Sequence, residues 1–214
     1  MQYRKIIKPP DHITLMDYKE ETKKAYNQHA GAFANKFLNL LEIHRRYEFK
    51  RFLELLNGKD ILDIGCGGGD HSLFFKNQGL NVKAIDLSEE MIKICKQKDI
   101  DAEVMDLEDM SFKDNSFDGV WAVTSLLHVP KEKIDNVLRK ISDILRPKGI
   151  FYICVKEGDE EGMVPDKNSD TKRFFAFWKE EELLNELKKY FEIIESKKVE
   201  LRDRMFIQIF CRKT

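Results

Sequence analysis

Three absences limit what this chain can be. Its four cysteines, at positions 66, 95, 154 and 211, form no Cys-x-x-Cys pair, and none stands next to a histidine. That spacing argues against a structural zinc site and a disulfide framework, so we expect reduced thiols and no bound metal. No apolar run approaches the roughly 20 residues that a transmembrane helix needs, and the basic segment 1–10 lacks the apolar stretch of a signal peptide. The sequence therefore predicts a cytoplasmic protein with no membrane partner.

Net charge is also nearly absent. The 37 basic and 38 acidic side chains give a formal net charge of −1. Because binding to DNA or RNA depends strongly on positive charge, nucleic acid is not the expected partner, although a local basic patch would not change these totals. The 214 residues, 42% of them hydrophobic, suffice for one domain with a sizeable core.

The chain does contain an alternation of strand and helix patterns. Segment 17–56 repeats apolar residues at three- and four-residue steps, which predicts helix, and it ends at Asn57-Gly58, a typical helix C-cap. Short apolar strands then alternate with amphipathic helices, which predicts a doubly wound parallel sheet. The predicted strands are 61–64, 82–86, 102–106, 117–123 and 149–155, and the last helix among them is 131–145.

The final third of the chain changes character. Segment 156–173 is polar and rich in Gly, Asp and Glu, which predicts a mobile loop. After a helix at about 179–189, only two residues separate the apolar-rich segments 191–201 and 204–212, which predicts an antiparallel hairpin. We expect residues 1–57 to form a helical lid on a core that spans residues 58–214.

The clearest functional signal lies between the first predicted strand and the helix after it. Gly65, Gly67 and Gly69 stand where the chain must turn sharply, and glycine permits both a positive φ and the close approach of a ligand. Asp86 ends the next strand, 21 positions after Gly65, where a carboxylate can accept the hydroxyl groups of a ribose. Turn, spacing and strand context together predict a nucleotide-binding loop.

Acidic residues around this loop indicate which nucleotide it binds. The dinucleotide fingerprint G-x-G-x-x-G needs glycine at its last position, where this chain has Asp70. Asp63, two residues before the first glycine, adds a carboxylate that would repel a pyrophosphate and attract a ligand bearing an ammonium and a sulfonium. Charge therefore favours S-adenosylmethionine over NAD as the cofactor.

Five segments, in order along the chain, resemble the motifs of the class I S-adenosylmethionine-dependent methyltransferases. They are 61–69, 84–91, 106–112, 116–129 and 145–150. The resemblance implies a Rossmann-like α/β fold whose seven-stranded, mostly parallel sheet has helices on both faces and ends in the antiparallel C-terminal hairpin. It also implies an enzyme that transfers the sulfonium methyl group and releases S-adenosylhomocysteine.

The resemblance implies a role for each matched position. The first motif would face the methionine part of the cofactor, Asp86 the ribose, and Asp106 the adenine amino group. Tyr26 lies in a stretch similar to the Tyr-Asp-x-x-Ala lead of small-molecule members, where the tyrosine closes over the cofactor. Asn27 departs from this pattern, because it replaces the aspartate. Ordinary helix packing is the alternative role for Tyr26. The implied cofactor-binding residues are Tyr26, Asp63, Gly65, Cys66, Gly67, Gly69, Asp86, Leu87, Met91, Asp106, Leu107 and Ala122.

Few catalytic residues are expected, because a sulfonium methyl group is already electrophilic. The protein must mainly align the acceptor and exclude water, and it needs a general base only when the nucleophile carries a proton. His128, just after the fourth strand, is the candidate catalytic residue; the alternative is a histidine that only hydrogen-bonds its loop. The aromatic cluster at 174–178 either walls a substrate pocket or anchors the helix that follows.

The expected function is methylation of an O, N, S or C atom of a small molecule. Modification of RNA or protein and a non-catalytic S-adenosylmethionine-binding regulator remain alternatives. DNA amino-group methylation is disfavoured, because segment 123–126 lacks the Asn/Asp-Pro-Pro-aromatic signature. An NAD dehydrogenase is disfavoured by Asp70 and by the C-terminal hairpin.

Overall fold

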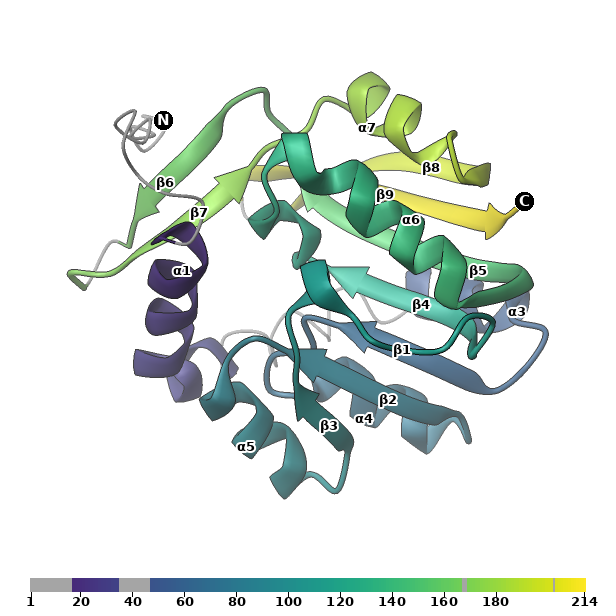
Figure 1. Cartoon of the computed structure of the whole chain (residues 1–214), viewed down its shortest axis with the longest axis horizontal. Coiled ribbons are helices and arrows are strands. Elements are labelled where there is room, and N and C mark those ends of the chain that lie inside the picture. The colour runs from purple at the N-terminus through teal and green to yellow at the C-terminus, as the bar shows by residue number, and fades with distance from the viewer. Residues whose placement is uncertain (1–16, 35–46, 167–168, 202) are drawn as a thin grey trace.

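The centre of the molecule is a seven-stranded sheet of order β3-β2-β1-β4-β5-β9-β8 (Figure 1). It is seen in a computed structural model that describes residues 17–34, 47–166, 169–201 and 203–214. The strands are β1 (Asp60–Ile64), β2 (Asn81–Asp86), β3 (Asp101–Val104), β4 (Phe117–Val123), β5 (Leu145–Lys156), β8 (Phe191–Leu201) and β9 (Arg204–Lys213). Strands β1 to β5 pair in parallel, and β9 runs antiparallel to both β5 and β8. This order confirms the predicted Rossmann-like sheet with its C-terminal hairpin.

Helices cover both faces of the sheet, as predicted. They are α3 (Glu48–Leu55), α4 (Asp70–Asn77), α5 (Glu89–Gln97), α6 (Ile134–Ile144) and α7 (Glu180–Leu187). In β1, Ile61 packs with Phe52 of α3 and Phe75 of α4, while Leu62 and Ile64 pack with residues of α6 on the opposite face. Figure 1 accordingly shows α6 in front of the sheet, with α3 and α4 behind it.

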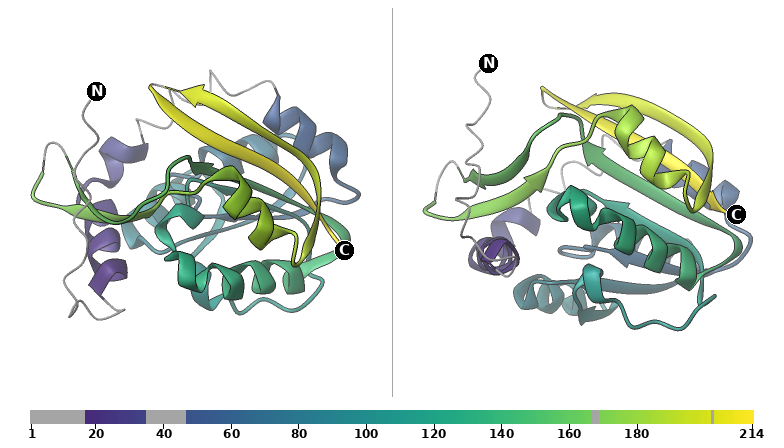
Figure 2. Two further views of the ribbon diagram at one scale, coloured as in Figure 1. Left: turned by 90° about the horizontal axis from the view of Figure 1, so that it is seen from above. Right: turned by 45° about the horizontal axis from the view of Figure 1, so that its top comes forward.

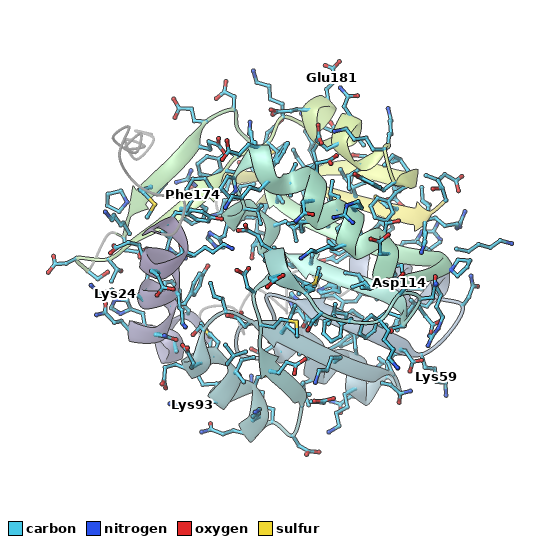
Figure 3. The ribbon with its side chains drawn as sticks, in the orientation of Figure 1. Lys24, Lys59, Lys93, Asp114, Phe174 and Glu181 are labelled. Atoms are coloured by element: carbon cyan, nitrogen blue, oxygen red, sulfur yellow. The ribbon has the colours of Figure 1, made fainter. Side chains whose placement is uncertain are left out.

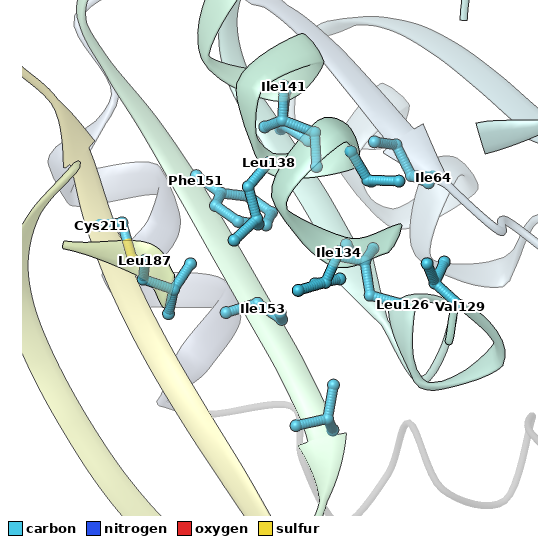
Figure 4. Packing of buried hydrophobic residues seen from close by; sticks show 14 of the residues in the cluster. Ile64, Leu126, Val129, Ile134, Leu138, Ile141, Phe151, Ile153, Leu187 and Cys211 are labelled. Atoms are coloured by element: carbon cyan, nitrogen blue, oxygen red, sulfur yellow. The ribbon is translucent and has the colours of Figure 1, made fainter. Parts of the chain in front are cut away.

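The larger core lies between α6 and the sheet. Ile134, Leu138 and Ile141 recur at three- and four-residue steps on α6 and meet Phe151 and Ile153 of β5 (Figure 4). All five side chains are at most 1% exposed. Burial of one such side chain contributes about 1.5–3 kcal/mol, so this interface fixes α6 and, through it, the loop that follows β4.

A roof of two segments lies over the edge at which β1, β2 and β4 end (Figures 1 and 2). One segment is α1 (Asp17–Gln28), and the other is the antiparallel pair β6 (Glu161–Pro165) and β7 (Lys172–Ala176). The two segments touch: the Phe174 N–H donates to Thr22 Oγ1 at 2.9 Å, and the Tyr18 and Phe174 rings lie 5.1 Å apart. The cover of the sheet edge therefore includes a hairpin as well as the N-terminal helix.

The prediction of a loop over residues 156–173 is wrong where the structure has strand β6 and the first residues of β7. Met163 and Val164, 3% and 7% exposed, point to opposite faces of β6. Met163 packs in the roof with Tyr18, and Val164 belongs to the larger core, which offsets the polar composition around them. The predicted helical stretch 17–56 is interrupted by a turn at His29, and its residues 35–46 lie outside the described part of the chain. The division of the chain at residue 57 stays a prediction.

Smaller differences concern element ends. The predicted third strand is shorter, because the chain turns into a 3-10 helix, η1 (Leu107–Asp109). Two further 3-10 turns follow β4, η2 (Leu126–His128) and η3 (Lys131–Lys133), and the second replaces the first turn of the predicted helix 131–145. Strand β5 begins at Leu145, four residues earlier than predicted. None of the helices in the described ranges is long and apolar enough to cross a membrane.

Candidate cofactor and active site

An open cleft lies between the roof and the carboxyl ends of the parallel strands. Its empty volume, including the solvent at its mouth, is about 1120 Å³. It is lined by residues 65–68 after β1, 86–88 after β2, 105–108 after β3 and 123–125 after β4, and by one side of α1. Ligands of open α/β sheets bind at this edge, where successive crossovers leave the sheet on opposite faces.

Most of the predicted site residues meet in this cleft. Those that line it are Tyr26, Gly65, Cys66, Gly67, Asp86, Leu87, Met91, Asp106, Leu107 and His128. Asp63, Gly69 and Ala122 do not line it: Asp63 and Ala122 are 2% and 1% exposed within the sheet, and Gly69 precedes α4. Their roles toward a cofactor stay predictions.

The glycine loop has one face against protein and one face toward the cleft. Gly67 and Gly69 have φ of +52° and +79°, the left-handed region that glycine adopts without strain. A Cβ at Gly69 would lie 2.4 Å from Cys95 Sγ, whereas a Cβ at Gly67 would meet no atom within 4 Å. The bare backbone at Gly67 is therefore a cradle that a side chain would fill.

Asp86 joins this loop to the loop after β2. Its Oδ2 accepts from the Gly67 N–H and its Oδ1 from the Ser88 N–H, both at 2.9 Å. Burial raises the pKa of this carboxyl, and the two backbone donors oppose that rise. The carboxylate is thus held at the position where the sequence predicts a ribose contact.

Asp63 lies beneath the glycine loop on the α4 side of the sheet. Its Oδ2 accepts from Ser72 Oγ at 2.6 Å. Burial raises the pKa of Asp63 to about 7, and the nearby charge of Asp86 adds a smaller rise. A cation bound above the loop would lower this pKa, because it would favour the charged form.

Helix α1 is clamped onto the loop after β3 by charges. Lys19 Nζ lies 2.5 Å from Asp106 Oδ2 and 3.1 Å from Glu108 Oε2. Glu108 also pairs with Lys133 at 3.4 Å and accepts from the Tyr18 hydroxyl. Sequence reasoning missed Tyr18, Lys19 and Glu108 as cleft residues. Spacing offered a signal, because Tyr18, Thr22 and Tyr26 stand four residues apart on one face of a helix.

Asn27 ties the other end of α1 to the start of α5. Its Nδ2 donates to Glu89 Oε2 at 2.8 Å, and its Oδ1 accepts from Ser88 Oγ at 2.6 Å. Ser88 is also the N-cap of α5, because its Oγ accepts from the Met91 N–H at 3.1 Å. An amide fits this position better than a carboxylate would, since Glu89 requires a donor.

His128 contacts the roof through both of its ring nitrogens. Its Nδ1 lies 2.5 Å from the Phe174 carbonyl oxygen and its Nε2 lies 2.8 Å from the Tyr26 hydroxyl. Burial lowers the pKa of His128 to about 3. Phe174 and Phe175, each 5% exposed, pack against α1 and the His128 ring, so this end of the aromatic cluster anchors the roof.

His71 is a further cleft residue. Its Nδ1 accepts from the Trp121 indole N–H at 3.0 Å, which leaves the neutral ring with its proton on Nε2. Trp121 of β4 therefore holds His71 in one tautomer, at the end of the cleft next to the glycine loop.

The charges of the cleft suit a cationic ligand. The lining lysines, Lys19 and Lys23, are both paired, the second with Glu89 at 2.5 Å. Asp86 has no basic partner among the described residues, and Asp63 lies just below it. The bare backbone at Gly67 and this excess of carboxylate fit S-adenosylmethionine. In the described ranges, no group of three or more His, Cys, Asp or Glu side chains is placed to hold a metal ion.

Comparisons with known proteins agree with this fit. Residues 61–149 match the family model described as "Methyltransferase domain". A ubiquinone/menaquinone biosynthesis C-methyltransferase of Rickettsia prowazekii is 30% identical over 139 residues, covering 58% of this chain and 55% of that protein. The 2-methyl-6-phytyl-1,4-hydroquinone methyltransferase of Synechocystis sp. is 31% identical over 114 residues, covering 50% of this chain and 35% of that protein.

One solved structure matches almost the whole chain. The 1,6-didemethyltoxoflavin-N1-methyltransferase of Burkholderia thailandensis, with bound 1,6-didemethyltoxoflavin and S-adenosylhomocysteine, has a TM-score of 0.73 and 19% identity, and the match covers 99% of this chain and 95% of that one. At this identity the match shows the fold alone. Family model, sheet order and relatives together show that residues 61–149 form a methyltransferase domain of the class I S-adenosylmethionine-dependent type. The chain spans about one third to one half of the curated relatives it matches here.

Proposed function

We propose that this protein uses S-adenosylmethionine to methylate a small molecule. The observation that carries the proposal is the cleft beneath the roof: α1 lines it opposite the glycine loop, the β6–β7 hairpin braces α1, and both lysines among the described lining residues are paired. A cleft beneath a roof, with no unpaired lysine among the described residues that line it, suits a compact acceptor better than a phosphate backbone, which argues against RNA. A cytoplasmic location is part of the same proposal.

The residues of the cleft would divide the work of binding. Asp86 would hold the ribose, Asp106 the adenine edge, and the backbone at Gly67 the methionine part. S-adenosylmethionine, when bound, supplies an electrophilic methyl group. The roof would exclude water and fix the direction from which the acceptor approaches.

Relatives suggest which acceptors to try first. One relative is named for a hydroquinone and another for ubiquinone/menaquinone biosynthesis, and the solved structure of similar fold holds 1,6-didemethyltoxoflavin. Ring compounds with a nucleophilic carbon, oxygen or nitrogen are therefore the first set to test with this chain.

The test has two stages. Calorimetry with S-adenosylmethionine and S-adenosylhomocysteine should show binding, and failure to bind either form would refute the proposal. A screen of ring compounds with methyl-labelled cofactor should then find transfer. Label that enters RNA or protein fractions instead would favour the macromolecular alternative, and binding without any transfer would favour a non-catalytic regulator.

A further inference from the structure

One hydrogen-bonded chain, which we call the Tyr26 relay, joins Tyr26, His128 and Arg173. The Phe174 carbonyl can only accept, so His128 Nδ1, 2.5 Å away, carries a proton. Neutral His128 then has its lone pair on Nε2, and the Tyr26 hydroxyl donates to it across 2.8 Å. Both ring nitrogens have partners, so His128 is fixed in one tautomer and one orientation.

Arg173 completes the relay from the hairpin. Its Nη1 donates to the Tyr26 oxygen at 3.2 Å, and its Nη2 donates to Asp166 at 2.6 Å. The guanidinium carbon lies 5.2 Å from the centroid of the Tyr26 ring and 4.6 Å from that of Phe33. Asp166 thus orients Arg173, and Arg173 orients Tyr26 through both its hydroxyl and its ring.

The relay joins both segments of the roof to the turn that follows β4. Tyr26 is on α1, Arg173 on β7, and His128 ends η2, the turn that follows β4. Tyr26 and His128 line the cleft, whereas Arg173 stands behind them. The relay therefore links the cover of the cleft to the sheet edge at a point that the bound cofactor would face.

The protons of the relay stay in place over the physiological range. Burial, helped by the positive charges of Arg173 and Lys156, lowers the pKa of His128 to about 3, against the opposing effects of the hydrogen bond to the Phe174 carbonyl and of Asp166. Burial raises the pKa of Tyr26, with Asp86 and Asp166 adding to the rise and Arg173 opposing it. Between about pH 5 and pH 9 neither ring changes its charge.

We propose that His128 and Arg173 are positioning residues that act through Tyr26 to hold α1 closed over the cofactor, and that His128 exchanges no proton with the acceptor. The inference rests on the proposed function, since it assumes that the cleft takes S-adenosylmethionine. His128 is already the acceptor for Tyr26, so a second task as base would break the contact that fixes the roof.

The first experiment measures the affinity for S-adenosylmethionine by calorimetry. Tyr26→Phe keeps the ring and removes the hydroxyl, and we expect about tenfold weaker binding, the effect of one hydrogen bond. Arg173→Met should weaken binding to a similar extent, and the double variant should be little weaker than either one, because both changes break the same relay. Lys24→Ala, on the exposed side of α1 (Figure 3), is the matched control and should bind as the wild type does.

The second experiment compares His128→Gln with His128→Ala. A glutamine can accept from Tyr26 with its oxygen and donate to the Phe174 carbonyl with its nitrogen, so it rebuilds the relay without a titrating ring. Cofactor affinity should stay within about threefold of wild type for His128→Gln and fall about tenfold for His128→Ala. With an acceptor in hand, turnover by His128→Gln should stay within about threefold, and its pH profile should match that of the wild type.

Several outcomes would overturn the inference. Additive losses in the double variant, or equal losses for glutamine and alanine at position 128, would show that the contacts are not one relay. A turnover loss of 10²-fold or more in His128→Gln would indicate a base. Wild-type protein that does not bind S-adenosylmethionine rejects the proposed function, whereas wild-type binding with unchanged variants rejects the relay alone. Thermal unfolding of each variant confirms that the comparison is made between folded proteins.

Discussion

Replacement of Asn27 by aspartate should loosen the junction between α1 and α5. The native amide donates to Glu89 at 2.8 Å, while its oxygen accepts from Ser88 and, at 3.3 Å, from the Glu90 N–H. Aspartate keeps an accepting oxygen but places a second one where the donor was. Two carboxylates would then face each other at hydrogen-bond distance.

The size of the effect follows from three contributions. A lost hydrogen bond to a charged group costs about 1.5–3 kcal/mol. Repulsion between two charges about 4 Å apart adds about 1 kcal/mol in water and up to about 4 kcal/mol near a protein surface. The lower value, about 1 kcal/mol, applies here because Glu89 is 43% exposed and paired with Lys23. The start of α5 favours a negative charge by about 0.3–1 kcal/mol. We expect a net loss of about 2–3 kcal/mol in the free energy of unfolding.

A double-mutant cycle with Glu89→Gln, read by urea unfolding at low ionic strength, tests this reasoning. Glutamine at position 89 can donate to the new carboxylate, so Asn27→Asp with Glu89→Gln should recover at least about 1 kcal/mol. Glu90→Gln, whose carboxylate pairs with Lys93, is the control and should recover nothing. Wild-type stability of Asn27→Asp, or a loss that Glu89→Gln leaves unchanged, would refute the reasoning.

The same cycle has a pH signature. Lys23 and Asn27 lower the pKa of Glu89 to about 2 in the folded protein. Because the folded pKa lies below the unfolded one, the stability contributed by Glu89 is present above about pH 4 and is lost as the pH falls toward 2. The deficit of Asn27→Asp should therefore shrink below about pH 4, as the facing carboxylates become protonated.

Three further changes separate folding from binding. Gly67→Ala should still fold, with a loss of about 1–2 kcal/mol in the free energy of unfolding because alanine is strained in the left-handed backbone. Its affinity for S-adenosylmethionine, measured by calorimetry, should fall at least tenfold, because the methyl group fills the cradle. Gly69→Ala should lower the unfolding temperature further, because its Cβ would collide with Cys95. In the wild type, the folded pKa of Asp63, about 7, lies above the unfolded value, so the free energy of unfolding falls by up to about 4 kcal/mol as the pH rises from 4 to 7. Asp63→Asn should remove this dependence of stability on pH. Unchanged cofactor affinity in Gly67→Ala, or an unchanged fall in Asp63→Asn, would contradict these expectations.

The sheet could be predicted because each of its strands carries its own signal. The segment 117–123 ends in the four apolar residues 120–123, and β4 has the predicted bounds in the structure. The C-terminal hairpin follows in the same way from two apolar strands and a two-residue connection. Such signals are local in the sequence, so they need no knowledge of what the strand will pack against.

The roof could not be predicted in the same way, because its contacts join distant residues. Strand β6 has only Met163 and Val164 as large apolar residues, and it is stabilised by pairing with β7 and by packing on α1. Lys19 and Asp106 stand 87 positions apart, and nothing in either segment identifies the other as its partner. Two-residue apolar patterns and single charges are too common to indicate a tertiary contact.

His128 shows the same limit within the site. The sequence indicates a histidine at the rim of the sheet, where a base would be useful. Its tautomer and its low pKa depend on the Phe174 carbonyl and on burial under α1, which come from β7 and from the N-terminal helix. A residue's position could be predicted here, whereas its protonation could be learned only from its surroundings.

The two segments of the roof, α1 and β6–β7, both lie outside residues 61–149, the part that the family model matches. Divergence among relatives can therefore reshape the roof of the cleft while the glycine loop and the strand ends beneath it keep their geometry. Thr22 and Phe174, and likewise Tyr26 and Arg173, form complementary pairs across the two segments. Grafts intended to change acceptor preference should therefore exchange both segments as one cassette, since a transplant of either segment alone would separate these partners.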